Sequence, residues 1–100
     1  MAVEVLWSDN AKETYDANID YLNDAWTEKE IKKFLLRSEY VLLNIEDNPK
    51  LYPTSNKSKN IRKAVVSKQI TLYYRYYPSK KIVILLSFWN NYQDDKRKKF

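Results

Sequence analysis

The order of apolar and polar residues along the chain predicts a strand, then two helices, then three further strands. Residues 3–7, Val-Glu-Val-Leu-Trp, are rich in β-branched and aromatic side chains, which is typical of a short strand. Apolar residues then recur at steps of three and four, the spacing of one helix face: Ala11, Tyr15, Ile19, Leu22 and Trp26. Ser8, Asp9 and Asn10 offer helix-capping side chains, and Asn10, with Glu13 three residues later, fits a capping-box start for this helix.

A second helix is predicted to follow almost without a linker. Thr27 and Glu30 form the pattern of a capping box, in which each side chain binds the other residue's backbone N–H. An apolar stripe then runs from Ile31 to Ile45. The sequence Asp-Asn-Pro at residues 47–49 ends it, because proline lacks a backbone N–H and restricts the residue before it. Two long helices with so short a connection are expected to pack as an antiparallel hairpin.

The C-terminal half becomes strand-like after a polar loop predicted at residues 49–60. Three segments rich in Val, Ile, Leu and Tyr follow, with short turns between them: Ile61–Ser67, Gln69–Tyr77 and Lys81–Trp89. This pattern predicts a three-stranded antiparallel meander. Residues 82–86 are apolar on both faces, which predicts a central strand. We therefore expect one α+β domain over residues 1–100, with the helix hairpin packed on one face of the sheet.

The composition excludes several kinds of chemistry. The chain contains no Cys, no His and no Gly. A zinc site of the usual kind, thiol catalysis, imidazole acid–base catalysis and glycine-rich nucleotide-binding loops are therefore excluded. No apolar run approaches the ~20 residues that cross a bilayer, and the N-terminus lacks the layout of a signal peptide. We expect a cytoplasmic protein with no metal, no cofactor and no membrane partner.

Charge is divided unevenly between the two halves of the chain. Residues 1–48 hold 5 basic and 11 acidic side chains, whereas residues 49–100 hold 13 basic and 2 acidic ones. The domain should therefore have an acidic side and a basic side. A basic surface attracts phosphate backbones, acidic membranes or acidic protein partners.

The order of elements and several short motifs resemble the RelE/ParE toxin superfamily. The motifs are Trp-Ser at the end of the first strand, Tyr-Leu…Trp-Thr at the helix junction, Ile-x-x-Asn-Pro after the second helix, Arg62-Lys63 at the start of the meander and Tyr74-Arg75 in its middle strand. The segment from residue 87 to residue 95 is similar to the C-terminal segment of the ParE-like branch. The likeness covers nearly the whole chain.

This resemblance implies a growth-inhibiting toxin of a type II toxin–antitoxin system, the kind linked to plasmid stabilisation. Such toxins are neutralised by a cognate antitoxin, and operator DNA is bound only through the toxin–antitoxin complex. RelE-type members cleave mRNA in the ribosomal A site, and ParE-type members bind DNA gyrase. This chain lacks the histidine that several ribosome-dependent members carry after the last strand. We expect a ParE-like gyrase inhibitor; a ribosome-dependent mRNA endonuclease and a basic nucleic-acid-binding module without toxicity remain alternatives.

The candidate site residues lie in the basic half. Arg62 and Arg75 are expected on adjacent strands as a shared basic site, where an arginine fork binds a phosphate or a carboxylate. Each arginine could instead cap a strand edge or pair with a helix carboxylate. Lys63 could bind phosphate or only keep the protein soluble. Tyr73 could stack on a base, although tyrosines in strands more often pack.

The C-terminal candidates are Trp89, Asn90 and Tyr92, in the segment where the family places functional residues. Tyr92 stands where ParE-like relatives often carry an arginine, and phenol acts as a general acid or base only with a strongly lowered pKa. If the chain is a ribonuclease, its catalytic candidates are Arg62, Arg75 and Tyr92. In the middle strand, alternation predicts that Leu72, Tyr74 and Tyr76 face the core, with Tyr73, Arg75 and Tyr77 on the other face.

Overall fold

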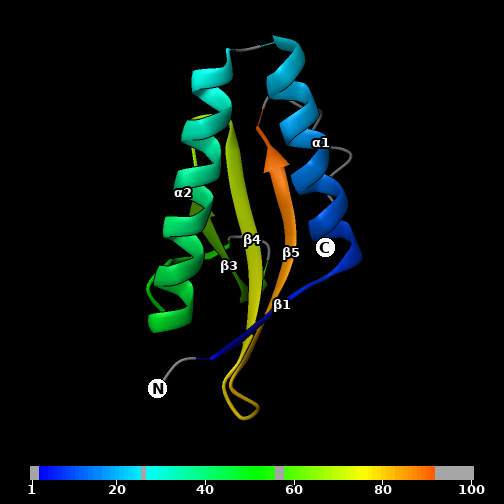
Figure 1. Ribbon diagram of the computed structural model, residues 1–100. Coiled ribbons are helices and arrows are strands. Elements are labelled where there is room, and N and C mark those ends of the chain that lie inside the picture. The colour runs from blue at the N-terminus through cyan, green and yellow to red at the C-terminus, as the bar shows by residue number, and fades with distance from the viewer. Residues whose placement is uncertain (1–2, 26, 56–57, 92–100) are drawn as a thin grey trace.

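In the computed structural model, which describes residues 3–25, 27–55 and 58–91, two long helices lie side by side against one face of a sheet (Figure 1). The elements in chain order are β1 (Glu4–Trp7), α1 (Asp9–Ala25), α2 (Glu28–Asp47), β2 (Thr54–Ser55), β3 (Ser58–Val65), β4 (Ile70–Tyr77) and β5 (Ile82–Asn90). The predicted α+β class and order of elements are confirmed, with one additional strand, β2. Within the described ranges, neither helix is long and apolar enough to cross a membrane.

The five strands form one mixed sheet in the order β1-β5-β4-β3-β2. β1 pairs with β5 in parallel, with Glu4 opposite Ile82 and Trp7 opposite Leu85. The other neighbouring strands pair antiparallel, so the predicted meander of β3, β4 and β5 is confirmed. β5 lies between β1 and β4, and this internal position agrees with its apolar sequence on both faces.

The loop predicted at residues 49–60 is shorter in the structure, because strands β2 and β3 take up part of this segment. Thr54 pairs with Arg62 of β3, and β3 itself begins at Ser58, three residues before the predicted start. The backbone N–H of Lys63 also donates to the Pro53 carbonyl, at 3.0 Å. A short edge strand is held by backbone hydrogen bonds and needs no alternation of apolar side chains, so the sequence pattern did not reveal it.

Both helices bury their predicted apolar faces against the sheet. The main core cluster contains Leu22 from α1, Phe34, Val41 and Ile45 from α2, and Leu72, Tyr74, Val83, Leu85 and Phe88 from β4 and β5. Four aromatic rings meet inside it, with Tyr15 in edge contact with Phe88 at a centroid distance of 5.0 Å. Trp26, the last residue of the predicted α1 stripe, lies outside the described residues.

A register shift between β4 and β5 changes the alternation of side chains along β5. Tyr73 lies opposite Ser87, and Tyr74 lies opposite Leu85, so Leu86 is the extra residue of a β-bulge. In β4 the prediction for the two faces is confirmed, because Tyr74 belongs to the main core whereas Tyr73 packs on the other side.

Helix α1 is capped by Ser8, one of the three predicted capping residues, and not through the predicted box of Asn10 and Glu13. The Ala11 N–H donates to Ser8 Oγ at 3.0 Å, which makes Ser8 the N-cap residue, and the helix begins at Asp9. Asn10 instead donates its side-chain amide to the Leu86 carbonyl at 3.0 Å. The predicted capping box of Asn10 and Glu13 is therefore wrong, because β5 supplies the partner of the Asn10 side chain.

Helix α2 is capped at the predicted residue but through its backbone. Thr27 is the N-cap in an extended conformation, and its side chain makes no cap hydrogen bond. Its carbonyl accepts from the N–H groups of Glu30 and Ile31, at 3.0 and 3.3 Å. The predicted side-chain capping box is wrong, whereas the predicted end of the helix at Asp47, before Asn48, is confirmed.

Beyond the end of β1, polar side chains of the α1 region satisfy the backbone of β5. We call this set the polar seam: Ser8, Asn10, Thr14 and Asn18. The Phe88 N–H donates to Thr14 Oγ1 at 2.9 Å, and Asn18 Nδ2 donates to the Phe88 carbonyl at 2.7 Å. A buried strand edge needs partners for its N–H and C=O groups, and the seam supplies them where β1 no longer does.

Candidate basic face of the sheet

Strand register gathers four of the predicted site residues on the sheet face opposite α1 and α2, which we call the outer face. Lys63 of β3 lies opposite Tyr73 of β4, and Arg75 lies opposite Ile61. Trp89 of β5 lies on the same side, opposite Thr71. Because residues directly opposite each other in an antiparallel pair share a face, Lys63, Tyr73, Arg75 and Trp89 form one surface.

The base of this surface is a second, smaller apolar cluster. It consists of Ile61, Tyr73 and Trp89, with Leu86 partly buried beside them. Both aromatic side chains are more than nine-tenths buried. In this structure they support the surface from below, while Lys63 and Arg75 are only half-buried and reach its exterior.

Arg75 holds a buried donor. Its Nε atom is buried and has no hydrogen-bond partner among the described residues. Unsatisfied buried donors are uncommon and each costs about 1–3 kcal/mol, so such a group often marks a functional position. No acidic residue occurs between residues 49 and 91. No carboxylate of β3, β4 or β5 therefore competes for Arg75; Glu4 of β1 is on the same face, and β5 lies between β1 and β4. This part of the outer face has the charge and the donors to bind an anion.

Arg62 faces the other way, and the predicted shared site of Arg62 and Arg75 is wrong. Arg62 lies opposite Tyr74, a residue of the main core, so its side chain is on the helix side of the sheet. Its Nη1 atom donates to the carbonyls of Tyr52 at 2.7 Å and Lys50 at 3.4 Å. Arg62 therefore anchors the segment between α2 and β2. Register across β3 and β4 places the two arginines on opposite faces.

Tyr74 reinforces the same anchor from the core. Its hydroxyl donates to the Pro49 carbonyl at 2.8 Å. Burial raises the pKa of Tyr74 to about 12, and the nearby positive charge of Arg62 offsets part of this rise. The phenol therefore stays protonated and continues to donate its hydrogen bond well above neutral pH.

The C-terminal candidates separate in the same way. Asn90 is buried and lies opposite Ile70, a residue of the main core, so it is on the helix side whereas Trp89 is on the outer face. Tyr92 lies outside the described residues, as does the charged tail that follows it. Of the seven candidates, four share the outer face and two, Arg62 and Asn90, do not.

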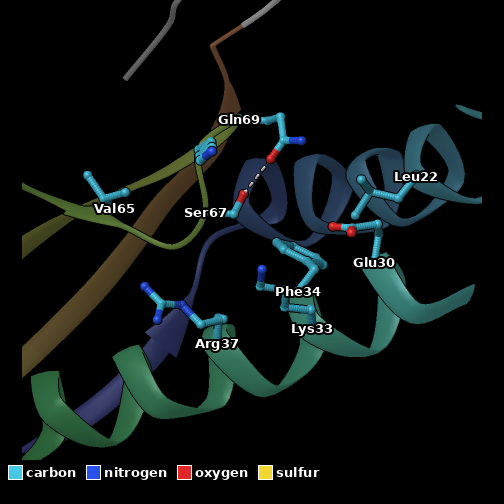
Figure 2. Close-up of a pocket in the computed structure, with 9 residues that line it drawn as sticks. Leu22, Glu30, Lys33, Phe34, Arg37, Val65, Ser67 and Gln69 are labelled. Carbon is cyan, nitrogen blue, oxygen red and sulfur yellow. Dashed lines mark hydrogen bonds between the residues drawn. The ribbon is translucent and has the colours of Figure 1, made fainter. Parts of the chain in front are cut away.

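Sequence reasoning missed a cavity of about 630 Å³ between the helices and the β3–β4 turn. Figure 2 shows Leu22 of α1 and Phe34 of α2 beside Ser67 and Gln69 of the turn, which are joined by a 3.1 Å hydrogen bond. The remaining lining residues are Glu30, Lys33, Arg37, Val65 and Lys68. On α2, the spacing of Glu30, Lys33 and Arg37 is that of an ordinary solvated helix face, so only the position of the turn above that face reveals the cavity.

Within residues 3–25, 27–55 and 58–91, no group of three His, Cys, Asp or Glu side chains could hold a metal ion. The described outer face offers the cations Lys63 and Arg75 above the apolar support of Ile61, Tyr73 and Trp89. Cations in such a setting are suited to binding an anionic group and to stabilising developing negative charge.

No protein-family model matches the chain, and no curated protein matches its sequence. Solved structures do match. The isolated RelE toxin of E. coli aligns with a TM-score of 0.64 and 11% identity, over 95% of this chain and 90% of that one. The YoeB dimer of Staphylococcus aureus aligns at 0.61 and 16% identity, over 92% of this chain and 100% of that one. YoeB–YefM, a heterotetrameric toxin–antitoxin complex from S. aureus, aligns at 0.58 and 14%, with the same coverage. The chain therefore has the RelE/YoeB-type toxin fold, in agreement with the resemblance to the RelE/ParE superfamily.

Proposed function

We propose that this chain is the toxin of a type II toxin–antitoxin pair, acting in the cytoplasm and neutralised by a cognate antitoxin. The observation that carries the proposal is the combination of this fold with a basic outer face that no carboxylate of β3–β5 neutralises. A soluble partner rich in acidic residues would bind such a face by charge complementarity.

Within this proposal, the target is DNA gyrase and inhibition occurs by binding. The described outer face holds Lys63 and Arg75 as its cations, because Arg62 is engaged at the opposite face. The chain has no His or Cys, and residues 49–91 contain no Asp or Glu. General acid–base catalysis requires a group that titrates near the operating pH. The cations of the outer face are therefore better suited to binding a target than to transferring a proton.

A second candidate function is cleavage of mRNA on the ribosome. It is favoured by the same two cations beside Tyr73, since lysine and arginine can stabilise the charge that develops when a ribose 2′-OH attacks a phosphate. In that case Arg75 would act in catalysis, with Tyr92 as a further candidate.

Pulse-labelling of DNA and protein synthesis after inducing the chain alone in a bacterial host tests both candidates. An earlier fall in DNA synthesis supports gyrase binding, and an earlier fall in protein synthesis supports message cleavage. Supercoiling by purified gyrase should then be inhibited by the chain. Unchanged supercoiling at high molar excess would exclude gyrase as the target.

The contribution of the outer face is tested with two charge-removing variants. Arg75→Gln is expected to abolish growth arrest, whereas Lys80→Gln, in the exposed β4–β5 turn, is expected to leave it intact. Thermal unfolding of both purified variants checks that the fold is retained. Normal growth of the host after expression of the folded wild-type chain would contradict the toxin proposal and favour a basic nucleic-acid-binding module.

A further inference from the structure

The cavity between α1, α2 and the β3–β4 turn has the composition of an anchor site for a peptide. Its inner wall is apolar and comes from Leu22 and Phe34, both buried. Its volume of about 630 Å³ is enough for one or two large side chains, since ligand pockets of proteins range over about 300–1,000 Å³. A large apolar side chain could therefore enter between the two helices.

The rim of the cavity is mainly basic. Lys33, Arg37 and Lys68 contribute three positive charges, and Glu30 contributes one negative charge. Arg37 Nε donates to the Val66 carbonyl at 3.1 Å, which orients the guanidinium beside the turn (Figure 2). An oriented guanidinium presents its outer nitrogens to a carboxylate as a fork. The rim therefore favours an acidic side chain next to the apolar anchor.

Exposed apolar residues extend this site along α2. Three of them follow the basic residues at steps of four and three on one side of the helix: Leu36, Tyr40 and Leu43, which are 67%, 62% and 57% exposed. Val65, at the cavity itself, is 61% exposed. Contiguous exposed apolar side chains bordered by charges are typical of protein interaction surfaces.

Charge complementarity decides which partner fits. A second copy of this chain, packed through the same surface, would bring its own net positive rim against the first, which is unfavourable. A nucleic acid would match the rim but would leave the apolar wall unfilled. A protein segment that carries acidic residues beside a large apolar one matches both parts of the site.

We propose that the cavity and the adjoining side of α2 hold such a segment of the antitoxin, separately from the outer face of the sheet. This inference rests on the proposed function, because it assigns the occupant to the neutralising partner. The apolar anchor packs on Leu22 and Phe34, and flanking carboxylates bind Arg37, Lys33 and Lys68.

The test measures binding of the full chain to the purified product of the adjoining gene by calorimetry. Lys33→Glu is compared with Lys12→Glu, the same charge change at an exposed position near the other end of the helix hairpin. Lys33→Glu is expected to raise the dissociation constant at least about tenfold, and Lys12→Glu less than about twofold. Equal affinities for Lys33→Glu and the wild type would overturn the inference. An Arg37→Lys variant, which keeps the charge and loses the fork, should also bind more weakly.

If the product of the adjoining gene does not bind the wild-type chain, that result counts against it as the antitoxin. A second measurement then tests the cavity by itself. An acetylated octapeptide of alternating glutamate and leucine is then titrated into the isotope-labelled chain. Shifts of the Leu22, Phe34 and Val65 amide signals support the peptide site. Unchanged signals at millimolar peptide would overturn the inference. A dimer of the wild-type chain that Lys33→Glu dissociates would also overturn it, because a second copy of the chain would then occupy the site.

Discussion

Replacing Asn18 by aspartate is expected to damage the polar seam more than any other single isosteric change in α1. Asn18 is only 4% exposed, and its side-chain amide donates to the carbonyls of Phe88 at 2.7 Å and Thr14 at 2.9 Å. Asn18→Asp preserves the shape and nearly the same helix propensity. It removes both donors and places a carboxylate against two carbonyl oxygens.

The expected loss follows from these contacts. The Phe88 carbonyl would be left without its side-chain donor, which costs about 1–3 kcal/mol when the group is buried. The new carboxylate would have no positively charged partner in the polar seam, which places the cost at the upper end of this range. We expect a loss of roughly 3 kcal/mol in the free energy of unfolding, out of the roughly 5–15 kcal/mol of a typical domain.

Urea unfolding at pH 7 measures the effect, with Asn23→Asp as the matched control at an exposed position of the same helix. A loss of roughly 3 kcal/mol lowers the urea midpoint by about 1–3 M. The control should lose less than about 1 kcal/mol, the usual cost of an exposed negative charge near a helix C-terminus. The gap between the variants should narrow as the pH falls toward 4, because protonation removes the buried charge. Equal midpoints for the two variants at pH 7 would refute the assignment of the seam.

Three further predictions concern the hydrogen bond from Tyr74 to Pro49, the α2 cap and the two arginines. Tyr74→Phe removes the hydrogen bond to Pro49 and should cost about 0.5–1.5 kcal/mol below pH 10. Burial raises the pKa of Tyr74 from 10.0 to about 12, so the contribution of its hydroxyl to stability is complete below pH 10 and is lost as the pH rises toward 12. The difference in the free energy of unfolding between wild type and Tyr74→Phe should therefore be smaller, or reversed, at pH 11 compared with pH 9. Thr27→Val should change stability by less than about 0.5 kcal/mol, and a loss of about 1 kcal/mol would show that the hydroxyl does cap α2. Arg62→Gln should lower the melting temperature and leave growth arrest intact, whereas Arg75→Gln should abolish growth arrest without lowering the melting temperature. Melting curves and a growth assay distinguish the two variants. Equal behaviour of the two would contradict the placement of the arginines on opposite faces.

The order of elements could be predicted because each depends on a local periodicity. The α1 stripe from Ala11 to Leu22 and the break at Asn48 follow from side-chain spacing and from the backbone of proline. The two faces of β4 follow from simple alternation, so Tyr73 and Tyr74 were placed on the correct sides. Charge counting likewise indicated a basic sheet half before any contact was known.

The arrangement of the candidate site could not be obtained in the same way. Alternation within β3 is ambiguous, because Ala64 and Val66 are buried whereas the equally apolar Val65 is exposed. Taking Ala64 and Val66 as the core positions would have placed Arg62 on the helix side, but nothing in β3 alone selects them. The cavity was missed for a related reason, since Lys33 and Arg37 have the spacing of any solvated helix surface.

The sequence by itself determined the elements, their inward faces and the polarity of charge, because these depend on neighbours within a few residues. The tertiary structure decided the parallel pairing of β1 with β5, the bulge at Leu86 and the register that puts Arg62 and Arg75 on opposite faces. Each of these is a relation between strands, and a shift of one residue in pairing exchanges the two faces of a strand. That register is set by the packing of the whole core, so no single segment contains it.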